Sequence, residues 1–157
     1  MSEFYRPKGL SSALSYLDPK AAFRWLEEAF GFEPLMVILD ANDVLLHSEM
    51  KYGDSVVMIG TEWSADHKSP KSLGGKTTQT VHVQLARGDD IDAHCERARS
   101  AGAEIIQAPD TQFYGDRTYR ARDAEGHIWT FGVTVKEMTP AEWDAAMGGG
   151  ARTQTRL

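Results

Sequence analysis

The stretch DPKAAFRWLEEAFG, residues 18–31, contains a complete set of signals for one helix. Asp18 is a typical N-cap, Pro19 suits the first helical position, and Gly31 is typical of the residue that follows a helix. The apolar residues recur at the spacing of one helical face, namely Ala22, Trp25, Leu26 and Ala29. The stretch therefore predicts an amphipathic helix that buries one side.

A second stretch of the same design, DDIDAHCERARSAG, covers residues 89–102. It begins at Asp89 or Asp90 and ends at Gly102, which lies 71 positions after Gly31. Asp18 and Asp89 are separated by the same 71 positions. One strand-like segment precedes each helix and three follow it, at residues 11–17, 34–39, 43–52 and 54–60 in the first copy and 78–86, 104–109, 116–123 and 127–133 in the second. The order β-α-β-β-β thus occurs twice, as in an internal repeat.

We expect residues 1–157 to form a single domain built from two repeat modules. Module one covers about residues 11–60 and module two about residues 78–135, joined by a linker loop over residues 61–77 that is rich in Gly, Ser and Lys. Near the C-terminus, Thr139 and Glu142 have the spacing of a capping box. This predicts a short helix over residues 139–147, followed by a disordered tail over residues 148–157.

Composition and charge narrow the class of protein. Hydrophobic residues make up 41% of the chain and charged residues 25%, as in globular proteins. No apolar run reaches the length of a membrane span, and no signal peptide is recognisable, so we expect a cytoplasmic protein without membrane contact. A net charge of −6 and the lack of a basic stripe argue against nucleic-acid binding. The single cysteine, Cys95, lies on the apolar helix face, which favours a small buried residue over a nucleophile.

Paired βαβββ modules resemble the vicinal-oxygen-chelate superfamily, which contains glyoxalase I, extradiol dioxygenases and bleomycin-resistance proteins. Three stretches carry the resemblance: SYLDPKAAFRWLEEAFGFE at 15–33, VHVQLARGDDIDAHCERARSAGAEI at 81–105 and YGDRTYRARDAEGHIWTFG at 114–132. The resemblance implies an α+β fold in which each module forms a curled mixed sheet around a cavity, with its helix on the convex side. It also implies a homodimer, as is common among the resembled proteins.

Strand alternation predicts which side chains face the helices and which face the cavity. In the first strand of module two, Val81, Val83 and Leu85 form an apolar face, so His82 and Gln84 belong to the cavity side. By the same alternation, the apolar or bulky residues of two other strands are expected against helices, and the residues between them are expected to face the cavity. The helix-side residues are Leu14, Tyr16, Trp129, Phe131 and Val133, and the cavity-side residues are Ser11, Ala13, Ser15, Ile128 and Thr130.

In the metal enzymes of the resembled superfamily, the first and last strands of each module supply one ligand each. The matching positions here are Ser11, Met58, His82 and Thr130. Only His82 is a good ligand for a catalytic divalent ion, because such ions need several converging imidazole or carboxylate groups. We therefore predict no metal site and no cofactor, which argues against glyoxalase-type isomerisation and extradiol ring cleavage.

The resemblance then favours a metal-free protein that binds a small molecule, similar to the bleomycin-resistance proteins. Such binding can provide drug resistance. Such a protein needs only a complementary cavity. The expected cavity residues are Ser11, Ser15, Met58, His82, Gln84, Tyr114, Arg120 and Thr130. The alternative is an isomerase or lyase in which His82 acts as an acid or base, or binds a metal together with other ligands such as His47 and Glu49.

Several residues allow two interpretations from sequence. Arg120 and Arg122 share one strand face, where they could clamp a carboxylate or phosphate, or could be the charges of a solvated edge strand. The loop aromatics Trp63, Phe113 and Tyr114 suit a lid or stacking wall, or else a loop anchor or dimer contact. The remaining histidines are expected outside the cavity: His47 facing out, His127 in a structural role, and His67 and His94 at the surface.

Overall fold

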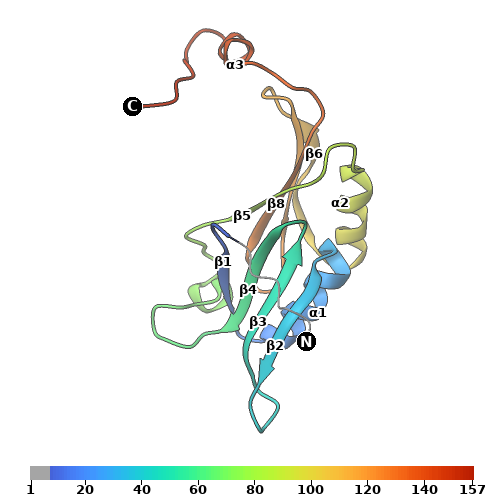
Figure 1. Ribbon diagram of the computed structural model, residues 1–157, viewed down its shortest axis with the longest axis vertical. Helices are drawn as coiled ribbons and strands as arrows, with labels where there is room; N and C mark the ends of the chain where they lie inside the picture. Colours follow the sequence, from blue (N-terminus) through green and yellow to red (C-terminus); the bar gives the residue numbers. More distant parts are fainter. Residues whose placement is uncertain (1–7) are drawn as a thin grey trace.

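The computed structural model describes residues 8–157 and contains two βαβββ modules (Figure 1). The first module comprises β1 (Ser12–Tyr16), α1 (Pro19–Phe30), β2 (Glu33–Leu39), β3 (Leu45–Tyr52) and β4 (Ser55–Thr61). The second comprises β5 (Val81–Gln84), α2 (Ile91–Ser100), β6 (Glu104–Thr111), β7 (Asp116–Arg122) and β8 (Ile128–Thr134). Each module forms one four-stranded mixed sheet, in the orders β1-β4-β3-β2 and β5-β8-β7-β6. The predicted α+β fold is therefore confirmed.

The two sheets repeat the same pairing. In each sheet the first strand of the module runs parallel to the last, and the other neighbours are antiparallel. Ala13 lies opposite Met58 in the first sheet, and His82 lies opposite Thr130 in the second. Because directly paired residues place their side chains on the same face of a sheet, these pairs define equivalent faces of the two modules.

The helix signals act much as the sequence predicts. The Asp18 side chain accepts a hydrogen bond from the Ala21 backbone N–H, and Gly31 ends α1 in the left-handed conformation with φ of 76°. This left-handed conformation favours glycine, because glycine has no Cβ atom that would clash with the backbone. Asp90 caps α2, but the last cap is Ala101, and the left-handed Gly102 follows it.

Both helices pack on one side of their sheets and share one core. Phe30 at the end of α1 packs against Trp129 and Phe131 of β8, with ring centroids 5.6 Å and 4.7 Å apart. The predicted helix-side residues Leu14, Tyr16, Trp129, Phe131 and Val133 are all buried in this cluster, as is Cys95. Among the elements formed by residues 8–157, no helix covers the opposite side of either sheet, and we call these sides the open faces.

Polar contacts join the ends of the two helices. The Arg97 guanidinium donates to the carbonyl oxygens of Glu27 and Glu28 at the end of α1, and Trp25 Nε1 donates to the carbonyl oxygen of Ala101 at the end of α2. Carbonyl groups in the last turn of a helix lack partners within the helix, so each helix supplies donors that the other needs.

His94 also lies between the modules, which corrects the expectation of a surface residue. Its Nε2 donates to the Phe30 carbonyl oxygen at 3.0 Å, so Nδ1 accepts the hydrogen bond from the Tyr119 hydroxyl at 2.7 Å. Burial lowers the pKa of His94 below its ordinary value, which keeps the ring neutral at neutral pH.

Outside the modules, a short 3-10 helix, η1 (Pro70–Leu73), lies in the linker, and α3 (Pro140–Ala146) follows the second sheet. The capping box of Thr139 and Glu142 is formed. Helix α3 extends beyond the second module (Figure 1), where Trp143 Nε1 donates to the carbonyl oxygen of Tyr114. No helix among residues 8–157 is long and apolar enough to cross a membrane.

Candidate functional site

The open face of the first sheet contains a cavity of about 280 Å³. Ser15 of β1 and Met58 and Gly60 of β4 lie along it, and His47 of β3 and Trp63 of the linker also line it. An added Cβ atom at Gly60 would meet no other atom within 4 Å, so the glycine leaves the space above β4 free. The predicted cavity residues Ser15 and Met58 are thus together at one hollow on the first sheet.

An aromatic pair from the linker stands beside this cavity. Trp63 is 70% exposed, and its ring lies 3.9 Å from that of His67, with the two planes inclined by 31°. The Ser64 hydroxyl lies 2.6 Å from His67 Nδ1, which fixes the imidazole. An exposed indole held in this way provides a flat surface on which a planar ligand can stack.

His47 lies on the open face, contrary to the expectation that it faces outward from the cavity. Ser48 and Met50 take the other side of β3 and are fully buried, so alternation directs His47 and Glu49 to the open face. His47 Nε2 lies 3.1 Å from Glu49 Oε1. This pair gives the first face one place that combines a hydrogen-bond donor with a carboxylate.

The open face of the second sheet is polar. A row of four paired residues crosses it from β5 to β6: His82, Thr130, Arg120 and Gln107. The row contains no carboxylate. Thr130 is 9% exposed, and its hydroxyl has no partner in residues 8–157. The centre of this face therefore carries one guanidinium and no acid within the row.

A hydrogen-bonded chain orients His82. Its Nε2 lies 2.9 Å from Gln84 Oε1 and must donate, because an amide oxygen only accepts. Gln84 Nε2 in turn donates to Asp116 Oδ2 and the Thr134 hydroxyl, at 3.2 Å and 3.3 Å. The His82 and Gln84 side chains lie over Gly132, where an added Cβ would approach them to within 3.4 Å and 3.1 Å. His82 Nδ1 is the ring nitrogen left for another partner.

The three arginines of β7 have different roles. Arg117 faces α2 and forms two hydrogen bonds with Asp92 at 2.7 Å and 2.8 Å. Arg122 pairs with Glu104 at 2.9 Å. Arg120 is exposed on the open face and has no hydrogen-bond or ion-pair partner among the described residues. Because β7 is paired on both sides, the interpretation of these charges as protection of an edge strand is wrong.

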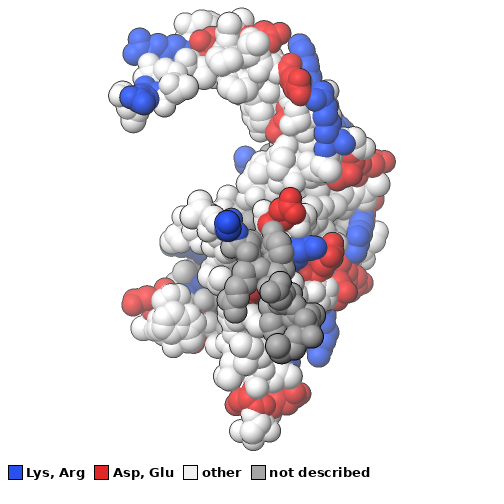
Figure 2. Space-filling model, viewed as in Figure 1, with Lys and Arg blue, Asp and Glu red and all other residues white. Residues whose placement is uncertain are grey.

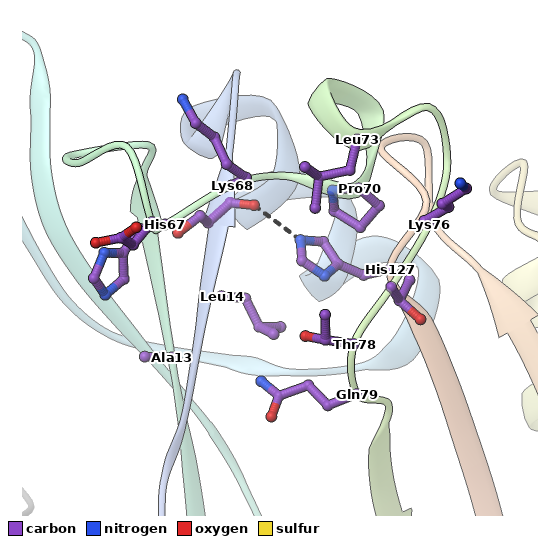
Figure 3. Close-up of a pocket in the computed structure, with 13 residues that line it drawn as sticks. Ala13, Leu14, His67, Lys68, Pro70, Leu73, Lys76, Thr78, Gln79 and His127 are labelled. Carbon is purple, nitrogen blue, oxygen red and sulfur yellow. Dashed lines mark hydrogen bonds between the residues drawn. The ribbon is translucent and has the colours of Figure 1, made fainter.

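Further cavities lie where the modules meet. One of about 340 Å³ brings Ser12 and Val57 of the first module near His82 and Gln84 of the second. Another, of about 170 Å³, lies between β1 and the linker (Figure 3). Leu14, Thr78 and His127 point into it, whereas the amino groups of Lys68 and Lys76 point away. His127 Nε2 donates to the Ser15 carbonyl oxygen at 2.9 Å, which fits its predicted structural role.

Two predicted cavity residues lie apart from the others. Ser11 is exposed and directly precedes β1. Tyr114 lies in the turn between β6 and β7, before β7 begins at Asp116, and Arg120 lies roughly 13 Å further along that strand at the rise of an extended chain. It stacks edge-on against Phe113 and accepts the Trp143 hydrogen bond through its carbonyl. Ser11 and Tyr114 therefore lie away from the other predicted cavity residues on the two open faces.

The metal positions implied by the superfamily do not fit a divalent ion. Ser11 and Met58 belong to the first module, while His82 and Thr130 belong to the second, and only His82 has a strong ligand atom. Within the part of the chain that the structure describes, no three His, Cys, Asp or Glu side chains converge as metal ligands would. His47 and Glu49 form a pair without a third such group.

Comparison with known proteins gives the family. Residues 13–131 match the model described as "Glyoxalase/Bleomycin resistance protein/Dioxygenase superfamily". The chain belongs to this superfamily. An uncharacterized relative from Mycobacterium tuberculosis, Rv0887c, is 31% identical over 142 residues, which cover 88% of this chain and 81% of the relative.

Solved structures agree with this membership. TioX from Micromonospora sp. ML1 is 29% identical, with a TM-score of 0.63 over 81% of this chain and 98% of TioX. TnmS3 from Streptomyces sp. CB03234, described as an antibiotic binding protein, has the same fold at 17% identity, with a TM-score of 0.58 over 85% of this chain and 97% of TnmS3. TnmS3, an antibiotic binding protein, thus shares its fold with this chain.

Proposed function

We propose that the chain is a metal-free small-molecule-binding protein of the glyoxalase/bleomycin-resistance type. The observation that carries this proposal is the cavity on the first open face. The flat, exposed indole of Trp63 and the apolar side chain of Met58 both line this cavity. Ligand sites in proteins typically pair apolar and aromatic walls with a few polar groups. The pair of His47 and Glu49 supplies such polar groups beside Met58 and Trp63.

The side chains at the metal-ligand positions of the superfamily also support binding over metal-dependent catalysis. Ser, Met and Thr at the superfamily's ligand positions make poor partners for a catalytic divalent ion. In the isomerase or lyase alternative without a metal, His82 would act through Nδ1, because Nε2 is occupied by Gln84. Within residues 8–157, the His82 ring is hydrogen-bonded to the Gln84 amide and not to a carboxylate, and this favours a binding role.

A homodimer forms part of this proposal. Several large apolar side chains remain exposed on the sheets: Val37, Ile38, Leu39, Leu46 and Ile106. Such side chains commonly mark a surface that another chain covers. A second copy of this chain that covers the open faces would enclose the ligand. Figure 2 shows both acidic and basic side chains on the side in view.

Native mass spectrometry of gently purified protein tests the function directly. We expect a bound organic molecule of low mass and no stoichiometric metal in elemental analysis of the same sample. The Trp63→Ala variant should lose this molecule, and the Trp143→Ala variant should retain it, because Trp143 lies on α3 away from the cavity. A stoichiometric divalent metal in the wild-type protein would contradict the proposal, as would equal retention of the molecule by both variants.

A further inference from the structure

Arg120 occupies a central position on the second open face. Strand β7 lies between β8 and β6, and Arg120 pairs with Thr130 on one side and Gln107 on the other. Side chains of directly paired residues are neighbours on one face, about 5 Å apart at their Cβ atoms. The guanidinium therefore emerges from the middle of a complete sheet.

Arg120 also lacks the partners that the neighbouring arginines have. Arg117 and Arg122, on the same strand, are held by Asp92 and Glu104. Among residues 8–157, no acceptor holds Arg120, and the paired Thr130 hydroxyl has none either. The Arg120 guanidinium and the Thr130 hydroxyl can therefore both donate to one ligand group.

The surrounding groups leave this donor set unneutralised. The row of His82, Thr130, Arg120 and Gln107 contains no acid. Asp116, which lies on the same face, accepts a hydrogen bond from Gln84 at 3.2 Å. A planar guanidinium matches the geometry of two oxygen atoms on one ligand group, as in carboxylates, sulfonates and phosphates.

We propose that Arg120 binds an oxyanion group of the ligand, so that the protein selects small organic anions over neutral molecules of the same shape. This inference rests on the proposed small-molecule function and adds the charge class of the ligand. Thr130, which is paired with Arg120, donates a further hydrogen bond to the same group.

Two fluorescent dyes that differ by one sulfonate test the inference. 8-Anilino-1-naphthalenesulfonate carries the group, and N-phenyl-1-naphthylamine is its neutral counterpart. We expect the wild-type protein to bind the sulfonate more tightly in fluorescence titrations. Arg120→Gln should weaken sulfonate binding about fivefold, which corresponds to about 1 kcal/mol for a solvent-accessible ion pair, and should leave binding of the neutral dye unchanged.

Arg24→Gln is the matched control, because Arg24 is an exposed arginine of α1 without a partner among the described residues. It should leave the affinities for both dyes unchanged. Raising the ionic strength should weaken only sulfonate binding to proteins that retain Arg120, because salt screens exposed charges.

The outcomes separate this inference from the function on which it rests. Equal affinity of the wild-type protein for both dyes overturns the inference and leaves small-molecule binding intact. Equal loss of sulfonate affinity in Arg24→Gln and Arg120→Gln also overturns it, because the effect would then be one of overall charge. Failure of the wild-type protein to bind either dye overturns both proposals.

Discussion

Replacement of Tyr16 by phenylalanine tests how strongly the two modules are joined. Tyr16 ends β1 of the first module, and its hydroxyl donates to Asp123 Oδ2 of the second module at 2.7 Å. The two residues are 1% and 7% exposed. Burial and the neighbouring carboxylate raise the pKa of Tyr16 well above its ordinary value, so the hydroxyl stays protonated and remains a donor.

The expected loss follows from the bonds that remain. A hydrogen bond to a charged acceptor contributes about 1.5–3 kcal/mol to stability. Tyr16→Phe keeps the ring, so it opens no cavity. Asp123 keeps three other donors, namely Trp129 Nε1 and the backbone N–H groups of Glu125 and His127. We therefore expect the free energy of unfolding to fall by about 2 kcal/mol, or Tm by roughly 4–8 °C for a chain of this size.

Urea unfolding followed by circular dichroism measures this loss. The matched control is Tyr114→Phe, because Tyr114 is 38% exposed and its hydroxyl has no partner among residues 8–157. The control should change the free energy of unfolding by less than about 0.5 kcal/mol. If Tyr16→Phe has an equally small effect, the Tyr16–Asp123 bond does not join the modules as argued.

Three further predictions concern other contacts. Glu125→Ala removes hydrogen bonds to the backbone of Leu17 and Asp18 and leaves the buried Ser69 hydroxyl without its acceptor, so the free energy of unfolding should fall by about 2 kcal/mol in the same urea assay. Burial raises the pKa of the Cys95 thiol, so Ellman's reagent should modify it only after unfolding, and rapid modification of native protein would contradict its burial. Because burial lowers the pKa of His94, the unfolded state takes up a proton before the folded state as pH falls below 6.5. The contribution of neutral His94 to stability should therefore be fully present above that pH, and the free energy of unfolding should fall below it by up to about 1.4 kcal/mol per pH unit. His94→Gln should flatten this pH dependence.

The fold was predictable because local signals agree with tertiary packing. Asp18 and Gly31 cap α1 as their residue types predict, and the apolar face of the helix is the one that enters the core. Alternation also worked where one face of a strand is bulky. Trp129 and Phe131 are buried, and Thr130 between them lies on the other side of β8.

The site was less predictable because alternation gives faces within one sheet and not the arrangement of two sheets. Ser15 and Met58 are on the first open face, whereas His82 and Thr130 are on the second, although one cavity was expected. In β3 the apolar residues fall on both alternating sets, so His47 could not be assigned from sequence. Its face follows only from the contacts that bury Ser48 and Met50.

His94 and Trp63 show the same limit in a helix and a loop. His94 stands among charged residues in α2, a pattern typical of a solvent-facing position. Its burial comes from Phe30, the last residue of α1, which contacts the His94 ring. The equivalent position of α2 lies 71 residues later in the chain, so the contact joins parts of the sequence that are far apart. Trp63 belongs to a linker without periodicity, so only the path of that linker along β1 brings its ring beside the cavity.

The two modules repeat their backbone but differ on their open faces. Gly60 and Gly132 occupy equivalent places on the last strands, opposite Ser15 and Gln84. The space above Gly60 is free, whereas His82 and Gln84 cover Gly132. One face therefore offers volume and an aromatic wall, and the other carries hydrogen-bonded polar side chains. A repeat kept only for stability would need neither difference, because both glycines lie on the side away from the core. In the proposed binding function, the first face would receive the planar part of a ligand and the second face its oxyanion group.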